Sequence, residues 1–199
     1  MSRAAAEAVR LHLEGLAEAA AAAAAAAVAS EAAAYAGRAA ATLEAGGRLL
    51  FCGNGGSAAT AEHVATEYVV RLRRSRAALP ATALTAGSAQ LTAAANDLGF
   101  ERAFVRILEA AGRRGDLLVL HSTSGESPNL LAAARAARDR GIGTVALLGA
   151  RGGRLAPLVD LAIRVPADEP QRVQELHLAI EHAVVGLVEE RFAAVEEDR

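Results

Sequence analysis

Polar side chains recur at helical spacing in the segment SAATAEHVATEYVVRLRR, which begins at Ser57. Intervals of three and four residues place four of them in one stripe of a helix: Thr60, His63, Glu67 and Arg71. An imidazole and a carboxylate one turn apart, such as His63 and Glu67, can share a divalent metal ion or a proton. Arg71 can meet an anionic group. A solvated helix face more commonly explains such a stripe, but its position directly after a phosphate-type loop favours an active site.

Two loops rich in glycine and hydroxyl groups each follow an apolar run and precede a helix. In the first, Gly53-Asn54-Gly55-Gly56-Ser57, backbone N–H groups can converge on an anion, and Ser57 is the predicted N-cap. The second, Ser122-Thr123-Ser124-Gly125-Glu126-Ser127, offers four hydroxyls ahead of Pro128, which suits a first helical turn. A tight turn or an elaborate cap explains either loop alone. Together they indicate a phosphorylated small molecule as the ligand.

The last helical segment, QRVQELHLAIEHAVVGLVEERF, is apolar on most of its circumference, which predicts a buried helix. One core stripe comprises Val173, Leu176, Ile180, Val184 and Leu187. A second face comprises Gln174, Leu178, His182 and Val185. Buried Gln174 and His182 need polar partners, which a ligand, a metal or another subunit can supply. His177 lies nearer the first stripe, and helical geometry alone does not decide between His177 and His182.

Short apolar runs alternate with helical stretches from residue 48 onward. The predicted strands are Arg48–Cys52, Ala81–Thr85, Asp116–His121, Gly143–Leu148 and Leu161–Val165. The predicted helices cover 57–74, 88–95, 101–112, 128–140 and 170–196. Such alternation is typical of an α/β fold whose parallel sheet is covered on both faces. Ligands of such sheets bind at the carboxyl ends of the strands, which is where both polar loops lie.

Two helices are predicted ahead of the first strand. Residues 3 to 29 are dominated by Ala, the best helix former, and a second helix runs from the N-cap candidate Ser30 to Gly46-Gly47. Neither carries a convincing catalytic residue. We therefore expect these helices to serve in packing, including packing against another subunit.

The composition excludes several classes of function. The chain contains no Lys, so chemistry that needs a Schiff-base lysine is ruled out, and Cys52 alone cannot form an intramolecular disulfide or a multi-cysteine metal site. A net charge of −2 gives no bulk attraction to nucleic acid, which is not an expected partner. The N-terminus lacks the apolar core of a signal peptide, and the run Ala17 to Val28 is too short to span a bilayer. We expect a cytoplasmic protein without a membrane partner.

Five motifs occur in order along the chain: CGNGGS at 52–57, HVATE at 63–67, ANDLGF at 95–100, STSGES at 122–127 and RVQELHLAIEH at 172–182. Together they resemble the phosphoheptose isomerases (sedoheptulose-7-phosphate isomerases) of the sugar-isomerase (SIS) domain superfamily. The resemblance runs from about Gly47 to Glu190. It implies a single SIS domain over residues 1–199, with an N-terminal helical region at 1–46 and the α/β core and C-terminal helix at 47–199.

The resemblance further implies a flavodoxin-like, five-stranded parallel sheet and a homotetramer with active sites between subunits. Glu67 matches the general base of the family, and His182 matches its partner acid. Members can carry zinc, and the matching ligands for one Zn²⁺ per subunit are His63, Glu67, Gln174 and His182. The residues that match substrate-binding positions, with hydroxyls on the phosphate, are Asn54, Gly55, Gly56, Ser57, Glu67, Arg71, Asn96, Asp97, Ser122, Thr123, Ser124, Ser127 and Gln174.

The implied reaction converts sedoheptulose 7-phosphate to D-glycero-D-manno-heptose 7-phosphate through an enediol. A base must move a proton between C1 and C2, and an acid or a metal must stabilise the developing oxyanion. A carboxylate and an imidazole in a partly buried cleft can do both. The predicted base Glu67 and the predicted acid His182 supply these groups.

Two positions depart from the family pattern. Thr60 stands where isomerases often have Asp, and Gln171 stands where an acidic residue is expected. Both changes bring the sequence nearer to a non-catalytic relative, the initiator-associating protein of bacterial DNA replication. A sugar-phosphate-sensing domain is a third possibility, because sensing requires the phosphate loops but not His182. Since His182 is present together with Glu67, the sequence favours an enzyme.

Overall fold

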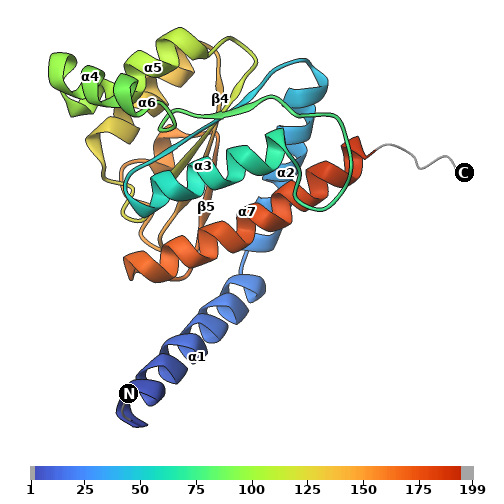
Figure 1. The fold of residues 1–199 in the computed structure, drawn as a ribbon, viewed down its shortest axis with the longest axis vertical. Helices are drawn as coiled ribbons and strands as arrows, with labels where there is room; N and C mark the ends of the chain where they lie inside the picture. The colour runs from blue at the N-terminus through green and yellow to red at the C-terminus, as the bar shows by residue number, and fades with distance from the viewer. Residues whose placement is uncertain (1–2, 194–199) are drawn as a thin grey trace, which may run out of the picture.

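The computed structural model describes residues 3–193, which form five strands that alternate with helices after two N-terminal helices (Figure 1). The strands are β1 (Leu49–Gly53), β2 (Ala81–Ala83), β3 (Leu117–Ser122), β4 (Gly143–Leu148) and β5 (Leu161–Arg164). The α-helices are α1 (Arg3–Ala25), α2 (Val28–Glu44), α3 (Gly56–Val69), α4 (Ser88–Leu98), α5 (Ala103–Ala111), α6 (Pro128–Asp139) and α7 (Pro170–Phe192). Two short 3-10 helices are η1 (Phe100–Arg102) and η2 (Ala156–Leu158).

All the strands are parallel and lie in one sheet with the order β2-β1-β3-β4-β5, which confirms the predicted flavodoxin-like, five-stranded sheet. The chain order reverses at β1, which is flanked by β2 and β3. Gly53 at the end of β1 pairs in register with His121 near the end of β3. The two predicted phosphate loops therefore leave the sheet side by side, at its carboxyl edge.

Alternate side chains of each central strand pack on opposite faces of the sheet, because strand side chains alternate in direction. On β3, Leu117 and Val119 belong to the core beneath α2, α3 and α7. Leu118 and Leu120 belong to the core beneath α5 and α6. Both faces are covered, so the strands read as nearly continuous apolar runs, as expected for a buried parallel sheet.

The helix boundaries differ from the predictions in two places that matter below. Helix α2 begins at Val28 rather than Ser30, whose hydroxyl donates to the Ala27 carbonyl oxygen at 2.7 Å and so lies inside the helix. Helix α3 ends at Val69 rather than at 74, because the N–H groups of 72–74 donate to a carboxylate of α7 and not to helical carbonyls. The predicted end of the last helix at 196 lies outside the described residues.

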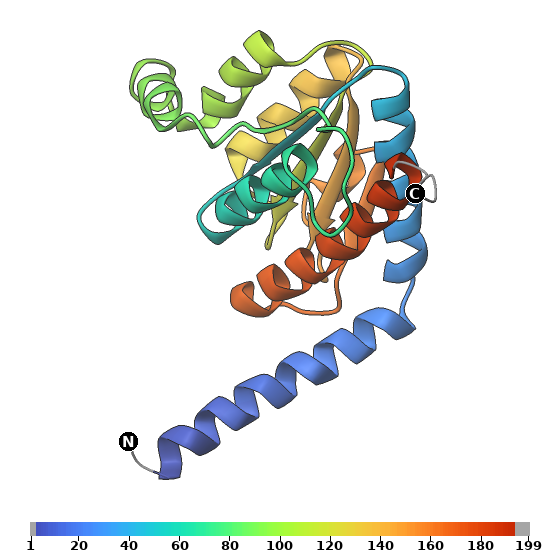
Figure 2. The same ribbon diagram turned by 45° about the vertical axis from the view of Figure 1, so that its right-hand side comes forward.

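Helix α1 extends away from the body of the protein (Figure 2) and contacts both α2 and α7. Ala23 is its one buried residue, whereas Val9, Leu11 and Leu13 are exposed. Arg172 Nη2 donates to the His12 carbonyl oxygen at 2.9 Å and connects the two helices. Among the described helices none is long and apolar enough by itself to cross a bilayer; α1 and α2 pass such a test only together, with a bend of 72° between them.

Candidate active site

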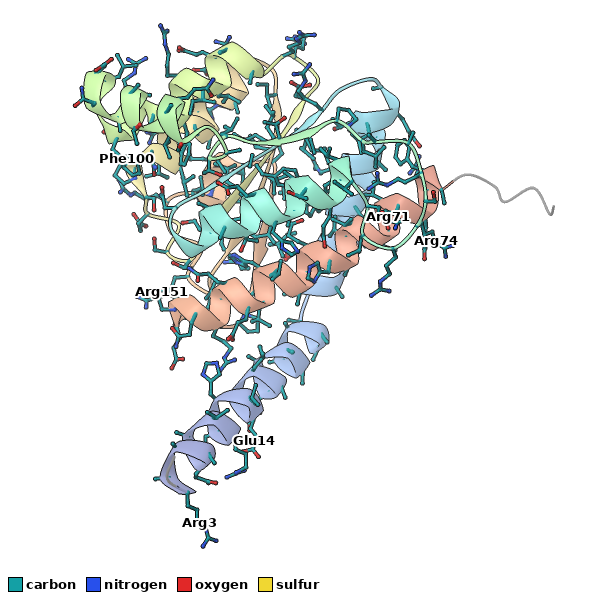
Figure 3. All side chains as sticks on the ribbon, in the orientation of Figure 1. Arg3, Glu14, Arg71, Arg74, Phe100 and Arg151 are labelled. Atoms are coloured by element: carbon teal, nitrogen blue, oxygen red, sulfur yellow. The ribbon has the colours of Figure 1, made fainter. Side chains whose placement is uncertain are left out.

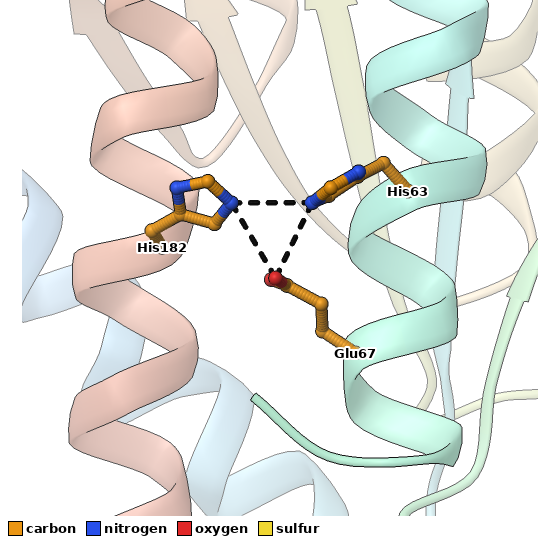
Figure 4. A group of neighbouring side chains, drawn as sticks. All are labelled: His63, Glu67 and His182. Atoms are coloured by element: carbon orange, nitrogen blue, oxygen red, sulfur yellow. Dashed lines mark hydrogen bonds and ion pairs between the residues drawn. The ribbon is translucent and has the colours of Figure 1, made fainter. Parts of the chain in front are cut away.

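Two imidazoles and a carboxylate meet between α3 and α7 (Figure 4). His63 Nε2 lies 3.2 Å from His182 Nε2, and Glu67 Oε1 lies 3.3 Å from the first and 3.4 Å from the second. The stripe predicted on α3 supplies His63 and Glu67 one turn apart. Helix α7 supplies His182, which decides the choice that helical geometry had left open, because His177 faces the core instead.

The three side chains combine solvent access with one shielded group. The side chains of His63 and His182 are 49% and 40% exposed, whereas that of Glu67 is 12% exposed. Glu67 Oε2 is buried and has no hydrogen-bond partner in the protein. Buried carboxylate oxygens normally have partners, so this oxygen is an exception in the structure.

The spacing of the three donor atoms fits a metal ion. A tetrahedral zinc ion with bonds of about 2.0–2.1 Å holds neighbouring ligand atoms about 3.3 Å apart. The observed separations of 3.2, 3.3 and 3.4 Å match that value. Two imidazole nitrogens and one carboxylate oxygen are also donor types that zinc prefers, and three protein ligands leave a coordination position for substrate or water.

Gln174 lies two turns before His182 on α7, and its amide packs directly on Gly56 at the start of α3. A Cβ at Gly56 would lie 2.8 Å from Gln174 Cδ and 2.9 Å from Nε2, so a side chain at this position would displace the Gln174 amide. The amide therefore covers the first phosphate loop. That Gln174 binds substrate and is a fourth metal ligand stays a prediction.

The first loop turns into α3 two residues earlier than predicted. Gly55 is the N-cap, with a φ of 56° that favours glycine, and Ser57 is the second helical residue rather than the cap. The Ser57 N–H donates to the Asn54 carbonyl oxygen at 3.0 Å, and the residue is buried. The loop still points the N-terminus of a helix toward the carboxyl edge of the sheet, as an anion site requires.

The second loop is shaped by its own hydroxyls. Ser122 Oγ accepts the Gly125 N–H at 3.0 Å, and Ser124 Oγ accepts the Glu126 N–H at 3.2 Å. Helix α6 begins at Pro128 as predicted, and Ser127 is its N-cap, although its hydroxyl makes no capping hydrogen bond. Thr123 is half-buried, and that Thr123 and Ser127 bind the phosphate stays a prediction.

An amide pair that sequence reasoning missed joins the two loops. Asn54 Nδ2 donates to Asn129 Oδ1 at 2.9 Å, and Asn129 Nδ2 donates to Asn54 Oδ1 at 2.8 Å. Asn129 is buried in the first turn of α6, so the reciprocal pair fixes the first loop relative to the second. The only signal in the sequence is a polar residue in the first turn after a polar loop.

Three predicted substrate residues lie away from the triad. Arg71 is exposed, beyond the end of α3 and beside the end of α7 (Figure 3). Asn96 and Asp97 are exposed on α4, where Asn96 Nδ2 donates to Asp97 Oδ1 at 2.8 Å. Helix α4 is on the far side of the molecule from α7 in both ribbon views (Figures 1 and 2). Within one chain the side chains of Asn96 and Asp97 therefore do not contact the triad.

The two residues that depart from the family pattern, Thr60 and Gln171, each form a hydrogen bond with a nearby residue of the chain. Thr60 is buried, and its hydroxyl donates to the Gly56 carbonyl oxygen at 3.3 Å, one turn earlier in α3. Gln171 is exposed at the start of α7, where its Nε2 donates to Glu169 Oε2 at 3.0 Å. Neither residue belongs to the His63–Glu67–His182 group.

A second histidine–glutamate group, which the sequence did not reveal, lies behind the triad. His121 Nε2 is 2.7 Å from Glu181 Oε1, with both side chains 0% exposed, and the Tyr35 hydroxyl donates to Glu181 Oε2 at 3.1 Å. His177 lies beside His121, with ring centroids 6.2 Å apart. Burial first, and the neighbouring His121 second, lower the pKa of His177 to about 3. Burial and the nearby Glu181 raise the pKa of Tyr35.

Comparison with known proteins identifies the family. The family model described as SIS domain matches residues 7–149. The phosphoheptose isomerase of Rhodospirillum rubrum is 48% identical over 159 residues, which are 80% of this chain and 85% of that protein. The phosphoheptose isomerase of Chlorobaculum parvum is 54% identical over 153 residues, covering 75% and 73% of the two chains.

Solved structures agree with the sequences. Phosphoheptose isomerase from Neisseria gonorrhoeae superposes with a TM-score of 0.86 at 36% identity, covering 92% of this chain and 98% of that one. The enzyme from Francisella tularensis gives a TM-score of 0.88 at 32% identity, covering 96% and 100%. Together with the motifs at the two loops and the triad, these matches show that the chain belongs to the phosphoheptose isomerase family of SIS-domain enzymes.

Proposed function

We propose that the protein converts sedoheptulose 7-phosphate into D-glycero-D-manno-heptose 7-phosphate through an enediol, with Glu67 as the base and His182 as the acid. The observation that carries this assignment is the contact of Glu67 Oε1 with both imidazoles while Oε2 is buried without a partner. The Glu67 carboxylate takes the proton from C1 of the ketose and returns it to C2. His182 moves the matching proton from the C1 oxygen to the C2 oxygen, which limits the negative charge that builds up on the substrate oxygens.

Zn²⁺ is the cofactor that we propose for the triad, with His63, Glu67 and His182 as ligands and Gln174 as the fourth. When bound, the ion supplies electrostatic stabilisation of the oxygen that carries negative charge in the enediolate. Protein residues orient the carboxylate and shield it from water. His63 Nε2 contacts Glu67 Oε1 at 3.3 Å and so helps to orient the carboxylate, and the low exposure of Glu67 limits proton exchange with bulk water.

The phosphate is proposed to bind at the two loops, where hydroxyls and helix N-termini converge without a fixed cation. Seven residues of helix separate Gly56 from His63, which is about 10 Å along the α3 axis at 1.5 Å per residue. An extended seven-carbon chain with a terminal phosphate also spans about 10 Å, given carbon–carbon bonds of about 1.5 Å. A heptose held by its phosphate at the loops therefore presents C1 and C2 at the triad.

We further propose a cytoplasmic homotetramer with active sites between subunits. Asn96 and Asp97 match substrate positions but lie on α4, far from the triad of their own chain, so a neighbouring subunit can bring them together. Exposed apolar residues on α1 and an apolar groove of about 300 Å³ between α1, α2 and α7 support association.

The test is to incubate the purified, zinc-supplemented protein with sedoheptulose 7-phosphate and to follow the aldose product by NMR. Turnover that Glu67→Gln and His182→Ala both abolish supports the proposed reaction and the acid–base pair. Wild-type protein that binds the sugar phosphate without turning it over contradicts the proposal and favours a sensing role. Metal analysis of the same samples decides on zinc independently of activity.

A further inference from the structure

We propose that Arg76 and Glu189 form a positioning pair that fixes the distance between α3 and α7 and thereby the geometry of the His63–Glu67–His182 triad. The inference rests on the proposed function, because it assigns the pair a role only through that triad. Neither residue belongs to the proposed catalytic or binding set. Arg76 follows the end of α3, and Glu189 lies near the end of α7.

Arg76 caps the helix that carries the proposed base. Its Nη2 donates to the main-chain oxygen of Glu67 at 2.7 Å, and its Nη1 donates to that of Tyr68 at 2.8 Å. Carbonyls in the last turn of a helix lack intrahelical partners, and a buried cation placed there satisfies them. The side chain of Arg76 is 0% exposed, so water does not compete for these bonds. Arg76 therefore holds the backbone of the catalytic glutamate directly.

Glu189 anchors the same region from the helix that carries His182. Its carboxylate lies 3.2 Å from Arg76 Nη2 and is 1% exposed. It also accepts the N–H groups of Leu72 at 2.8 Å, of Arg73 at 2.9 Å and of Arg74 at 3.2 Å. These bonds order the segment after α3 that begins with Arg71, a predicted substrate residue. The Glu189 carboxylate thus holds the backbone after Arg71 directly, and the backbone before Arg71 through Arg76.

The pair lies on the side of α7 that also faces α3 at the triad. Glu189 follows His182 by seven residues, which are two helical turns and return to the same face. His182 contacts Glu67 on α3, and Glu189 contacts the cap of α3 two turns later. Two contacts between the same helices fix their spacing and their rotation. Donor atoms of a zinc site must be held within a few tenths of an ångström, which one contact does not achieve.

A matched control exists one residue away. Arg74 and Glu190 form an ion pair between the same two segments, but Arg74 Nη2 and Glu190 Oε1 are 3.9 Å apart and the side chains are 58% and 63% exposed. Exposed ion pairs contribute little to stability, whereas removing one partner of a buried ion pair strongly destabilises the folded protein. Glu189→Gln and Glu190→Gln therefore make the same chemical change, the first in a buried ion pair and the second in a solvent-exposed one.

The experiment compares the full-length wild type with Glu189→Gln, Arg76→Lys and Glu190→Gln. Zn²⁺ affinity is measured by competition with a chelator, and kcat and KM are measured with sedoheptulose 7-phosphate, below the unfolding temperature of each variant. Outer-shell changes in metal sites typically cost about 10- to 100-fold in affinity or activity. We expect Glu189→Gln to weaken Zn²⁺ binding and to lower kcat at least about 10-fold, and Glu190→Gln to change neither by more than about 2-fold.

Arg76→Lys keeps the positive charge beside Glu189 but cannot reach both carbonyls of α3, so we expect an intermediate loss. This variant also tests the positioning role if Glu189→Gln does not fold.

The outcomes of the experiment separate a positioning role from a structural one. If a variant has lowered thermal stability but unchanged Zn²⁺ affinity and kcat, the pair is merely structural and the inference is overturned. If the wild type lacks turnover yet the variants lose Zn²⁺ affinity, the proposed reaction fails and the positioning role stands. A wild type that neither binds Zn²⁺ nor turns over overturns both.

Discussion

Two histidine–glutamate groups lie back to back on α7, because they use consecutive residues of the same helix. His182 faces α3 and joins His63 and Glu67, with the imidazoles 49% and 40% exposed. Glu181 faces the sheet and joins His121 and Tyr35, with Glu181 and His121 fully buried. The residue types are nearly the same, yet only the first group has an acidic oxygen without a partner.

The difference indicates that access for a ligand distinguishes a candidate reactive group from a structural one. Both carboxylate oxygens of Glu181 have protein partners, and its side chain is fully buried together with that of His121. Glu67 Oε2 has no protein partner, and the two imidazoles beside Glu67 reach solvent. The first group should therefore control turnover and the second should control stability. The following changes test that separation, from the largest expected effect to the smallest.

Glu67→Gln should lower kcat by about 10³- to 10⁴-fold, because an amide cannot accept the proton that the carboxylate moves. The free energy of unfolding should change by less than about 1 kcal/mol, since Oε2 makes no bond that the amide could lose. Steady-state kinetics and urea unfolding measure the two quantities. Glu62→Gln, exposed on the same helix, is the control. A large loss of stability with normal turnover would reverse the assigned roles.

Glu181→Ala should destabilise the protein by about 3–5 kcal/mol, because it leaves His121 and Tyr35 buried without their acceptor. The double variant His121→Leu with Glu181→Leu should recover most of that loss, since a packed apolar pair often replaces a buried ion pair without cost. Chemical unfolding of the three proteins gives the comparison. The kcat per folded molecule should stay within about 10-fold of the wild-type value. A loss of kcat as large as that of Glu67→Gln would show that the buried group also takes part in catalysis.

His177 should make the protein sensitive to acid. Its imidazole titrates near pH 6.5 in the unfolded chain but near 3 in the folded protein, because burial disfavours the charged form. Protons therefore bind only the unfolded chain as the pH falls from about 6.5 to 3, and stability is lost over that window. Between pH 7 and pH 5 this group alone should cost about 2 kcal/mol of unfolding free energy. Urea unfolding at both pH values should show a smaller drop for His177→Leu; an equal drop would assign the sensitivity to other groups.

Asn129→Ala should raise KM for the sugar phosphate about 10-fold while leaving kcat within a few-fold, because it frees the first loop from the second. Asn129→Asp should have an intermediate effect, since a carboxylate can accept from Asn54 Nδ2 but cannot donate back. Kinetics with varied substrate separate the two constants. If kcat falls and KM does not, the amide pair acts on the triad rather than on phosphate binding.

Arg191→Ala should have the smallest effect. Arg191 Nε lies 2.6 Å from Glu44 Oε1, but the side chains are 54% and 43% exposed. A pair this exposed should contribute no more than about 1 kcal/mol to stability and nothing to turnover. Thermal unfolding at low and high salt checks this. A larger change would show that exposure is a poor guide to which ion pairs matter in this protein.

The sequence predicted the sheet and much of the triad, because both depend on local periodicity. Alternating apolar runs indicated the parallel strands, and the stripe on one helix placed His63 beside Glu67. Helical periodicity alone did not select His182 over His177, since α7 is buried on several sides and a helical wheel does not say which neighbour faces each residue; the family resemblance selected His182, and the structure places it beside His63 and Glu67.

Two groups that depend on contacts between distant segments, and that the family resemblance did not supply, were missed. His121 and Glu181 are 60 positions apart, and Asn54 and Asn129 are 75 positions apart. No local pattern predicts such pairs, because each member is an isolated polar residue in an apolar strand, a helix or a polar turn. The end of α3 was misplaced for the same reason: its terminating carboxylate, Glu189, comes from another helix.

The second loop has one further property, set by two glycines. A Cβ at Gly125 would lie 2.7 Å from the carbonyl carbon of Gly152, and a Cβ at Gly153 would lie 2.7 Å from that of Gly125. Each obstacle is backbone, so no change of a neighbouring side chain can make room. A side chain at Gly125 or at Gly153 therefore requires a shift of the backbone. Evolutionary change in this part of the molecule is confined to its other positions for as long as the two backbone segments stay in contact.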